Sequence, residues 1–396
     1  MDSLLPYFLD WANLLLRWLH VVVAVAWIGA SVYFVWLDNH LFKPEAPDLK
    51  AKGVDGELWA VHGGGFYNPQ KYMVAPANLP QHLHWFYWES YWTWMSGFAL
   101  FTVLYLFNAD TFLIDKQVHD WSSGAAVAAA LGFLVSGWVA YDLICRLFGR
   151  NKDGSIGNDG VVLGLIAVFI VIAAWASAQL FAGRAAFLIT GAMIATMMTA
   201  NVFFWIIPGQ KQVIADMRAG RPVNPIFGQR GKQRSVHNTY LTLPVLIAML
   251  SNHYGMLYTH AQNWAVLCLL MLAGALVRTY FVKRHKGVNA WGLVVMVLVI
   301  LAGLIVWLKP APTPKVAAVT IEQVNAIVQQ RCMACHNAQF AQKDMHLQTP
   351  ELIEQHAQQI YQQVVVQKTM PLNNATQITD EERALIGAWF KARAAK

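Results

Sequence analysis

Long apolar stretches, separated by short polar segments, make up the first 308 residues of the chain. Eight of these stretches come close to the roughly 20 residues that a helix needs to cross the hydrocarbon core of a bilayer. A helix on the surface of a soluble protein carries a charged face along its length, and these stretches lack one. We therefore predict eight membrane-spanning helices, near residues 12–37, 89–108, 121–147, 160–181, 186–207, 236–252, 263–283 and 289–308.

The pattern changes at residue 309. Residues 309–319 begin with Lys-Pro-Ala-Pro-Thr-Pro, a composition typical of an extended, semi-rigid linker. Further on, Thr-Ile-Glu-Gln at 320–323 resembles a capping box, which begins a helix, and Thr-Asp-Glu-Glu at 379–382 is predicted to begin another helix. Apolar positions follow each of these helix starts at helical spacing: Val324, Ile327 and Val328 after the first, and Leu385, Ile386, Trp389 and Phe390 after the second. We expect two helices to pack around the small core of this segment.

These patterns predict an all-α protein with three parts. Residues 1–308 form a polytopic membrane helix bundle that carries the chemistry, residues 309–319 form the linker, and residues 320–396 form a small C-terminal domain. Composition supports the bilayer as a partner, because only 13% of the residues are charged against about 25% in soluble proteins. The seventeen tryptophans are typical of aromatic belts at the membrane interfaces.

Segments rich and poor in basic residues alternate along the chain. The segments after the first, third, fifth and seventh predicted helices hold sixteen Lys and Arg residues, whereas those after the second, fourth and sixth hold two. Under the positive-inside rule the rich segments face the cytoplasm, so both termini are predicted to lie outside it. The first helix is too long for a signal-peptide core and no Ala-x-Ala site follows it, so we expect an uncleaved anchor. The net charge of +7 comes largely from these loops and indicates no nucleic-acid partner.

Residues 332–336 read Cys-Met-Ala-Cys-His, the attachment pattern of a c-type haem. In this pattern the thiols of Cys332 and Cys335 form thioethers with the haem vinyl groups, and His336 is an iron ligand. Met370 lies where a small cytochrome c usually has its second ligand, and a Met/His pair suits electron transfer. A zinc half-site or a redox-active cysteine pair is the alternative. The chain has no second Cys-x-x-Cys and no thioredoxin-like βαβ pattern.

The other two cysteines, Cys145 and Cys268, lie in separate apolar stretches, so we predict that they are small buried hydrophobic residues. Covalent haem attachment takes place on the outer face of the bacterial inner membrane. The charge pattern places residues 309–396 on that same face. Since the two arguments share no residues, together they predict a multi-pass protein of the inner membrane with its haem domain on the periplasmic side.

Polar side chains recur on one face of the first predicted helix. At 100° per residue, Asn13, Trp27, Ser31 and Asp38 lie within about 20° of the direction of His20. Ionisable groups inside a membrane usually face a cavity or the bundle interior. Three readings of His20 stay open: a hydrogen bond between helices, ligation of a b-type haem, and contact with a substrate. His253, near the outer end of the sixth helix, is the candidate second ligand of that haem, and Arg17 lies one turn before His20.

Residues 62–94 are predicted on the cytoplasmic side. His-Gly-Gly-Gly at 62–65 does not have the glycine spacing of a P-loop, so we expect an irregular glycine loop. Glu89, where the second helix enters the membrane, is the acid/base candidate of this segment, and an interfacial carboxylate is the alternative. In the third helix, Asp142 and Arg146 have the i, i+4 spacing of a structural ion pair.

The sixth predicted helix begins with Gln-Arg-Ser-Val-His-Asn-Thr-Tyr at residues 233–240. Hydrogen-bonding side chains therefore gather where this helix enters the membrane, and Asn201 and Trp205 end the fifth helix at the same depth. Capping and interface contacts are one explanation of the cluster. A polar pocket for a hydrogen-bonding heterocycle is the other, and the spacing alone favours neither.

Three stretches resemble the PuuD-type bacterial membrane urate hydroxylases, in which a urate oxidase membrane domain is fused to a C-terminal cytochrome c domain. They are Trp-Leu-His-Val through Ala-Trp-Ile-Gly at residues 18–29, Thr-Ala-Asn-Val-Phe-Phe at 199–204, and Gln-Arg-Ser-Val-His-Asn-Thr-Tyr-Leu-Thr-Leu-Pro at 233–244. Residues 368–372 and 379–387 resemble the class I-like haem domain of that family. The resemblance covers nearly the whole chain, and it carries the haem ligation over to Cys332, Cys335, His336 and Met370.

The resemblance implies two-electron oxidation of urate to 5-hydroxyisourate, a reaction of purine catabolism, with electrons leaving through the haem to a respiratory acceptor. Urate is an anion at neutral pH, so the reaction needs a base and groups that hold an anionic ring. Our hypothesis assigns the base to His237 or Glu89. In the same hypothesis, Asn201, Asn238 and Tyr240 orient the urate ring, and Arg17 or Arg234 balances its negative charge.

A pocket near the cytoplasmic face would be separated from an outer haem by most of a roughly 30 Å membrane. Either the pocket lies higher, near His20 and Arg17, or a second cofactor such as a b-type haem bridges the gap. Two other classes of function stay open. One is a non-catalytic respiratory module whose membrane part binds quinol or a partner complex, and the other is a transporter with a fused cytochrome.

Overall fold

The computed structural model describes residues 5–73, 76–309, 319–339 and 345–394. Up to residue 309 its helices are α1 (Leu5–His40), α2 (Pro47–Ala51), α3 (Trp88–Phe101), α4 (Ala109–Phe112), α5 (Ser123–Leu147), α6 (Asp159–Leu180), α7 (Gly183–Asn201), α8 (Ile207–Arg218), α9 (Pro225–Leu250), α10 (Gly255–Tyr258), α11 (Asn263–His285) and α12 (Trp291–Trp307). Two π-helical segments, η1 (Thr102–Leu106) and η2 (Val202–Ile206), extend α3 and α7, and the 3₁₀ segment η3 (Ser251–His253) follows α9. The main part of the predicted linker, residues 310–318, is outside the described residues.

Each of the eight predicted spans falls on a helix, but fewer than eight of these helices are both long and apolar enough to cross a membrane. Within the described residues, five helical segments are long and apolar enough to cross a bilayer: Tyr7–His40, Ser123–Leu147, Asp159–Leu180, Gly183–Arg218 and Asn263–His285. Helix α12 is apolar but shorter, α3 is 14 residues long before η1 continues it, and α9 begins with a polar half.

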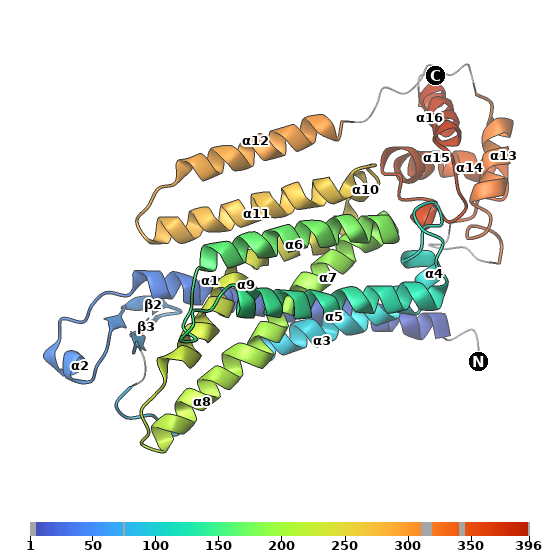
Figure 1. The fold of residues 1–396 in the computed structure, drawn as a ribbon. Helices are drawn as coiled ribbons and strands as arrows, with labels where there is room; N and C mark the ends of the chain where they lie inside the picture. The colour runs from blue at the N-terminus through green and yellow to red at the C-terminus, as the bar shows by residue number, and fades with distance from the viewer. Residues whose placement is uncertain (1–4, 74–75, 310–318, 340–344, 395–396) are drawn as a thin grey trace.

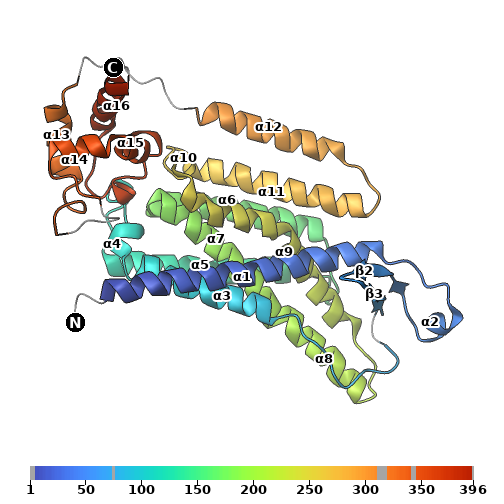
Figure 2. The ribbon, with the colours of Figure 1, turned by 180° about the vertical axis from the view of Figure 1, so that it is seen from behind.

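Helices α1, α3, α5, α6, α7, α9 and α11 lie side by side as a bundle, and α12 packs along α11 at its edge (Figure 1). The start of α1 and the C-terminal helices lie at one end of this bundle in both views (Figures 1 and 2). Helices α2 and α8 project at the opposite end, where α5 and α11 also finish. The start of α1 and the end of α16 therefore lie at the same end of the bundle.

Two clusters of buried apolar side chains hold the bundle together. The larger one joins α5, α6, α7, α9 and α11, and the other joins η1, α4, α5 and α7. Small residues bring α5 and α7 close to each other. A Cβ at Gly137 would lie 2.2 Å from Cγ of Met193, and Ala130, Ala185 and Ala186 are buried. Small residues at such contacts are typical of helix packing in membranes.

The segment between α1 and α3 corrects one prediction. Residues 62–65 are not an irregular loop, because β2 (Ala60–His62) and β3 (Gly65–Tyr67) form an antiparallel hairpin. The turn is made by Gly63 and Gly64, whose φ angles of 58° and 81° are accessible to glycine at little steric cost. A second pair, β1 (Gly56–Glu57) and β4 (Gln70–Lys71), lies beside it in sequence. The all-α prediction therefore holds for the bundle but not for this segment.

The C-terminal unit, residues 319–339 and 345–394, is built on two helices, α13 (Ile321–Arg331) and α16 (Asp380–Ala394). They share one apolar core, in which Val324, Ile386 and Trp389 are buried. Between them run α14 (Pro350–Gln355), α15 (Ala357–Ile360), the π-helical η5 (Tyr361–Val366) and the 3₁₀ segment η6 (Leu372–Asn374).

The predicted capping box at Thr320 and the predicted helix start at Thr379 are both confirmed. The backbone N–H of Thr320 donates to Gln323 Oε1 at 3.1 Å. At the start of α16, Thr379 N–H donates to Glu382 Oε2 at 2.9 Å, and Glu382 N–H donates to Thr379 Oγ1 at 3.2 Å. Glu382 also accepts from Arg331 Nη2 at 3.0 Å, which ties the end of α13 to the beginning of α16.

Candidate functional site

Polar side chains are buried together where α5, α6, α7 and α9 meet. We call this group the buried polar network. Its members are Tyr141 and Asp142 of α5, Asp159 of α6, Asn201 of α7, Trp205 of η2, and Gln233, Arg234, His237 and Asn238 of α9. Polar groups inside a membrane protein are costly unless they pair, and they often mark functional sites.

His237 lies at the centre of the buried polar network. Its side chain is fully buried, and Nδ1 lies 2.8 Å from the Tyr141 hydroxyl. Its Nε2 lies 3.1 Å from Oδ1 of Asp159, which also accepts from Gln233 Nε2 at 2.7 Å. The Asp159 side chain is 35% exposed. A proton on the imidazole therefore has a hydrogen-bonded route to a carboxylate that reaches the surface.

Two amides are fixed next to this histidine. Asn201 Nδ2 donates to the Tyr141 hydroxyl at 2.8 Å and to Asn238 Oδ1 at 2.9 Å. Asn238 Nδ2 donates in turn to the carbonyl oxygen of Met198 at 2.9 Å. Because each contact sets which end of the amide faces which partner, the donor and acceptor positions of the network are held in place.

A buried ion pair completes the network. Arg234 Nη2 lies 2.7 Å from Asp142 Oδ1, and the two side chains are 2% and 11% exposed. Asp142 also accepts from Trp205 Nε1 at 2.8 Å and from Arg146 Nε at 2.6 Å. The predicted Asp142–Arg146 pair is thus confirmed, but Asp142 holds the buried Arg234 as well. The Arg234 guanidinium also lies 4.9 Å from the ring centroid of Tyr141, within cation–π range.

The network unites four of the seven side chains named for the reaction: Asn201, Arg234, His237 and Asn238. The other three lie elsewhere. Tyr240 is half-buried and has no hydrogen bond to the network, and Glu89 is half-buried in the first turn of α3. Arg17 is exposed and donates from Nη2 to Asn13 Oδ1 at 3.2 Å.

Reasoning from sequence missed two members that contact His237. Tyr141 and Asp159 are 96 and 78 residues away from it in the chain. An acidic residue at a helix start is common, so nothing local marks Asp159 as a histidine partner. Cys145 is buried as predicted. Its Sγ lies 3.9 Å from His237 Nδ1, the nitrogen that Tyr141 also contacts. Cys268 is only half-buried.

The two histidines assigned to a b-type haem lie in different environments. His20 Nδ1 lies 3.1 Å from the Thr93 carbonyl oxygen and 3.1 Å from Ser96 Oγ, so it links α1 to α3 by hydrogen bonds. Gly97 makes room for the ring, since a Cβ there would lie 2.8 Å from His20 Cε1. His253 is exposed in η3. The geometry favours the interhelical reading of His20, and the b-type haem stays a prediction.

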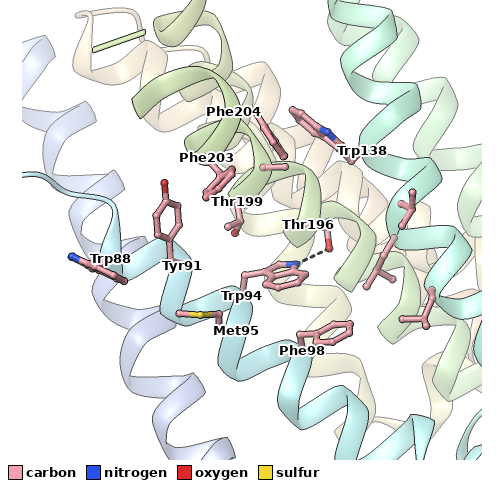
Figure 3. Close-up of a pocket in the computed structure, with 14 residues that line it drawn as sticks. Trp88, Tyr91, Trp94, Met95, Phe98, Trp138, Thr196, Thr199, Phe203 and Phe204 are labelled. Atoms are coloured by element: carbon pink, nitrogen blue, oxygen red, sulfur yellow. Dashed lines mark hydrogen bonds between the residues drawn. The ribbon is translucent and has the colours of Figure 1, made fainter. Parts of the chain in front are cut away.

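An aromatic cavity of about 730 Å³ lies between α3, α5 and the end of α7. Figure 3 shows Trp94 and Phe98 of α3 opposite Thr196, Phe203 and Phe204, with Trp138 on α5. Its lining is Trp88, Tyr91, Trp94, Met95, Phe98, Leu131, Leu134, Val135, Trp138, Thr196, Thr199, Ala200, Phe203 and Phe204. Carbon atoms dominate this surface, so the cavity suits a flat apolar ring better than a polar heterocycle.

The Cys-x-x-Cys-His turn follows α13 directly. The backbone N–H groups of Cys335 and His336 both donate to the carbonyl oxygen of Cys332 at 3.1 Å. His336 Nδ1 lies 3.2 Å from the Met345 carbonyl oxygen, an arrangement in which Nδ1 carries the proton and Nε2 is free to bind a metal. Both thiols are free, and Cys332 and Met370 pack against the core of the C-terminal unit. The donor set therefore fits a covalently attached haem with His and Met ligands.

The C-terminal unit contacts the bundle close to Met370. A Cβ at Gly255 would lie 2.2 Å from the carbonyl oxygen of Gln367, so α10 and this loop are in close contact. A polar cavity of about 640 Å³ lies at the junction, with Lys368 and Thr369 on one side and Arg184 on the other. The loop that carries the proposed second haem ligand thus faces the bundle.

Comparison with known proteins identifies one relationship. A protein-family model described as "Urate oxidase N-terminal" matches residues 6–309. The matched region contains the buried polar network and the aromatic cavity and ends before the Cys-x-x-Cys-His turn. No curated protein and no solved structure matches the chain.

Proposed function

The chain belongs to the urate oxidase N-terminal family, and from this premise we propose that it oxidises urate to 5-hydroxyisourate within the membrane and delivers the electrons to the respiratory chain. The family supports a urate-related oxidation. The five apolar helical segments support a bilayer setting. The specific product and the route of the electrons are our proposal.

The observation that carries the proposal is the His237 site inside the matched region. Oxidation at C5 of urate requires loss of protons from the ring and from the attacking water. His237 is placed to accept such a proton, because Asp159 can pass it towards the surface. The amides of Asn201 and Asn238 hydrogen-bond to each other and to Met198, and they would hold a purine edge by exchanging some of these bonds for bonds to the ring. A positioned base of this kind contributes about 10²- to 10⁴-fold to a rate.

We assign the C-terminal unit, residues 320–396, to a cytochrome c domain. Cys332 and Cys335 would attach the haem, and His336 and Met370 would bind its iron. When bound, such a haem accepts and releases single electrons at a raised potential. The chain's own contribution is to set the proximal ligand through Met345 and to hold the Met370 loop against the bundle.

We also propose a topology. Eight crossings, made by α1, α3, α5, α6, α7, α9, α11 and α12, place both termini on the periplasmic side of a bacterial inner membrane. The basic segments at the opposite end of the bundle support this orientation under the positive-inside rule.

This arrangement leaves a wide separation between the two centres. From His237 to Leu250 the axis of α9 rises by about 20 Å, at 1.5 Å per residue, and the C-terminal unit lies beyond that end (Figure 1). The rate of electron tunnelling falls steeply with distance. A carrier between the network and the haem unit would shorten each step.

The test of the function is a urate titration of the purified full-length protein with oxidised haem. We expect urate, but not xanthine, to reduce the haem, as measured by its absorbance. His237→Ala abolishes this reduction, whereas His20→Ala retains it if His20 only links helices. Failure of urate to reduce the wild-type protein overturns the function. Reduction by a quinol alone supports a non-catalytic respiratory module, the second candidate, which the apolar aromatic cavity favours.

A further inference from the structure

We propose that the aromatic cavity is a binding site for the ring of a membrane quinone, which receives the two electrons of urate. The proposal rests on the function proposed above and names the carrier close to the buried polar network. The quinone is the first acceptor, and the C-terminal unit acts later in the sequence.

The shape and chemistry of the lining select the class of ligand. Seven of the fourteen lining side chains are aromatic, and they come from three elements that face one another (Figure 3). Flat rings of this kind stack on a planar ligand. Trp94 uses its indole N–H internally, donating to Thr196 Oγ1 at 3.0 Å. Urate, whose edge carries several donors and acceptors, would lose its hydrogen bonds with water in this cavity without replacing them.

The surroundings of the cavity favour a ligand that arrives from the bilayer. Apolar side chains beside and within the lining are strongly exposed on the protein surface: Trp88 is 54% exposed, Val135 64% and Phe204 55%. In a membrane these surfaces face lipid tails. A quinone with an isoprenoid tail can therefore place its ring in the cavity while the tail stays in the hydrocarbon.

The aromatic faces of the cavity distinguish a quinone ring from a lipid acyl chain. Tyr91 lines the cavity with its ring and is half-buried. Nearly all of the lining surface is carbon. A quinone ring stacks on these faces, whereas an acyl chain has no flat ring to stack.

The cavity and the buried polar network share a wall. Trp138 lines the cavity, and its ring centroid lies 5.9 Å from that of Tyr141. Thr199 and Ala200 also line the cavity and directly precede Asn201. Two side chains in series, Trp138 and Tyr141, therefore lie between a quinone ring in the cavity and His237, which is a shorter gap than the one to the C-terminal unit.

The reaction balances without another reactant. Urate loses two electrons and two protons while water adds to C5, where a C–O bond forms. The quinone gains two electrons and two protons and leaves as quinol. The sum is urate, water and quinone giving 5-hydroxyisourate and quinol.

Binding is tested first, with full-length protein in quinone-free lipid nanodiscs and an azidoquinone with a short alkyl tail as photolabel. We expect labelled peptides from α3, α5 and η2, and competition by the unlabelled quinone but not by an alkane alcohol of equal tail length. Val135→Trp fills the cavity, and Phe98→Leu removes one stacking face. Each should weaken the binding of the unlabelled quinone about three- to tenfold, the range for loss of an aromatic pair. Trp175→Leu on exposed α6 is the matched control and leaves it unchanged. Labelling elsewhere, or equal competition by the alkane alcohol, overturns the site.

Turnover is tested second, by measuring quinol and 5-hydroxyisourate together. We expect quinone-free protein to oxidise urate slowly, and added short-tail quinone to restore the rate with one quinol per product. If quinone-free protein reduces its haem with urate at the full rate, the quinone step is wrong and the proposed function stands. If urate is not oxidised with quinone or with ferricyanide, the proposed function fails, while the labelling result still decides whether the cavity binds quinone.

Discussion

The hydroxyl of Tyr141 lies 2.8 Å from Nδ1 of His237, a contact that joins α5 to α9 inside the bundle. The same hydroxyl accepts from Asn201 Nδ2 and keeps its own proton to donate. The Asp159 carboxylate can only accept, so a neutral His237 carries its proton on Nε2, and its Nδ1 then accepts from Tyr141. A second proton can enter the ring only by displacing one of these contacts, which is how a substrate would engage the site.

Replacing His237 by Gln should lower the rate of urate-dependent reduction about 10²- to 10⁴-fold, because the base is lost. Asp159→Asn should give a smaller loss, since the imidazole keeps its place but loses its charged partner. Stopped-flow measurement of haem or quinone reduction gives both rates, and an unchanged haem spectrum shows that the fold is intact. Glu89→Gln is the comparison variant, because Glu89 lies outside the network. An equal loss in Glu89→Gln would transfer the role of base to that residue.

Asp142→Ala should destabilise the protein by about 3–5 kcal/mol, because it leaves the buried Arg234 guanidinium without its counter-ion. The measurement is denaturant unfolding of the full-length protein in detergent. The double variant Asp142→Ala/Arg234→Met should recover part of the loss, since no buried charge remains. Arg146→Ala removes the more exposed partner of Asp142 and should cost about 1 kcal/mol or less. A double variant no more stable than Asp142→Ala would contradict the ion-pair account.

Cys332→Ser combined with Cys335→Ser should yield protein without thioether-bound haem, as read by a pyridine haemochrome spectrum. Met370→Leu should keep the covalent haem and alter its visible spectrum, because the thioether ligand is lost. Met345→Leu is a matched control: that residue holds His336 through its backbone carbonyl, so its side chain is not a ligand. A spectral change in Met345→Leu but not in Met370→Leu would exclude Met370 as the second ligand.

The start of α16 should weaken in acid. A hydrogen bond from Lys368 Nζ, 2.8 Å away, lowers the pKa of Asp380 below its ordinary value of 3.8. The pair therefore stabilises the fold above about pH 4, and this contribution is lost as pH falls through the folded pKa. Because the side chain is exposed, the effect is about 1 kcal/mol or less. Hydrogen-exchange protection of α16 in full-length protein should decrease from pH 5 to pH 3, and Asp380→Asn should make that decrease smaller, with the remainder coming from Glu382, whose pKa is also lowered.

Sequence patterns located the helices because hydropathy depends on composition within one segment. The two helix starts were also predictable, since Thr320 and Thr379 each meet a partner only three residues away. The polar cluster of α9 was predicted together with Asn201, because both lie at helix ends of equal depth. These successes share one property: the deciding contacts are local, or follow from depth alone.

The partners of the site needed the tertiary structure. The rotation of α9 about its own axis decides whether His237 or Tyr240 points towards α5 and α7. Hydropathy does not set that rotation. Glu89 lies outside the network for the same reason, because its depth in the bundle does not set which way α3 turns it. The glycine hairpin was missed because its strands are only three residues long, too short to show an alternating pattern.

The polar half of α9 also affects how the protein is made. A translocon releases segments into lipid according to their hydrophobicity, and an arginine near the centre of a helix costs about 2.5–3.5 kcal/mol on that scale. Arg234, His237 and Asn238 find their partners only on α5, α6 and α7, which are synthesised earlier. We therefore expect α9 to insert stably into the bilayer only after it has packed against α5, α6 and α7. A substitution of Asp142 would then lower the amount of inserted protein in cells, because chains that fail to insert are degraded. This loss would precede any measurable effect on the catalytic rate.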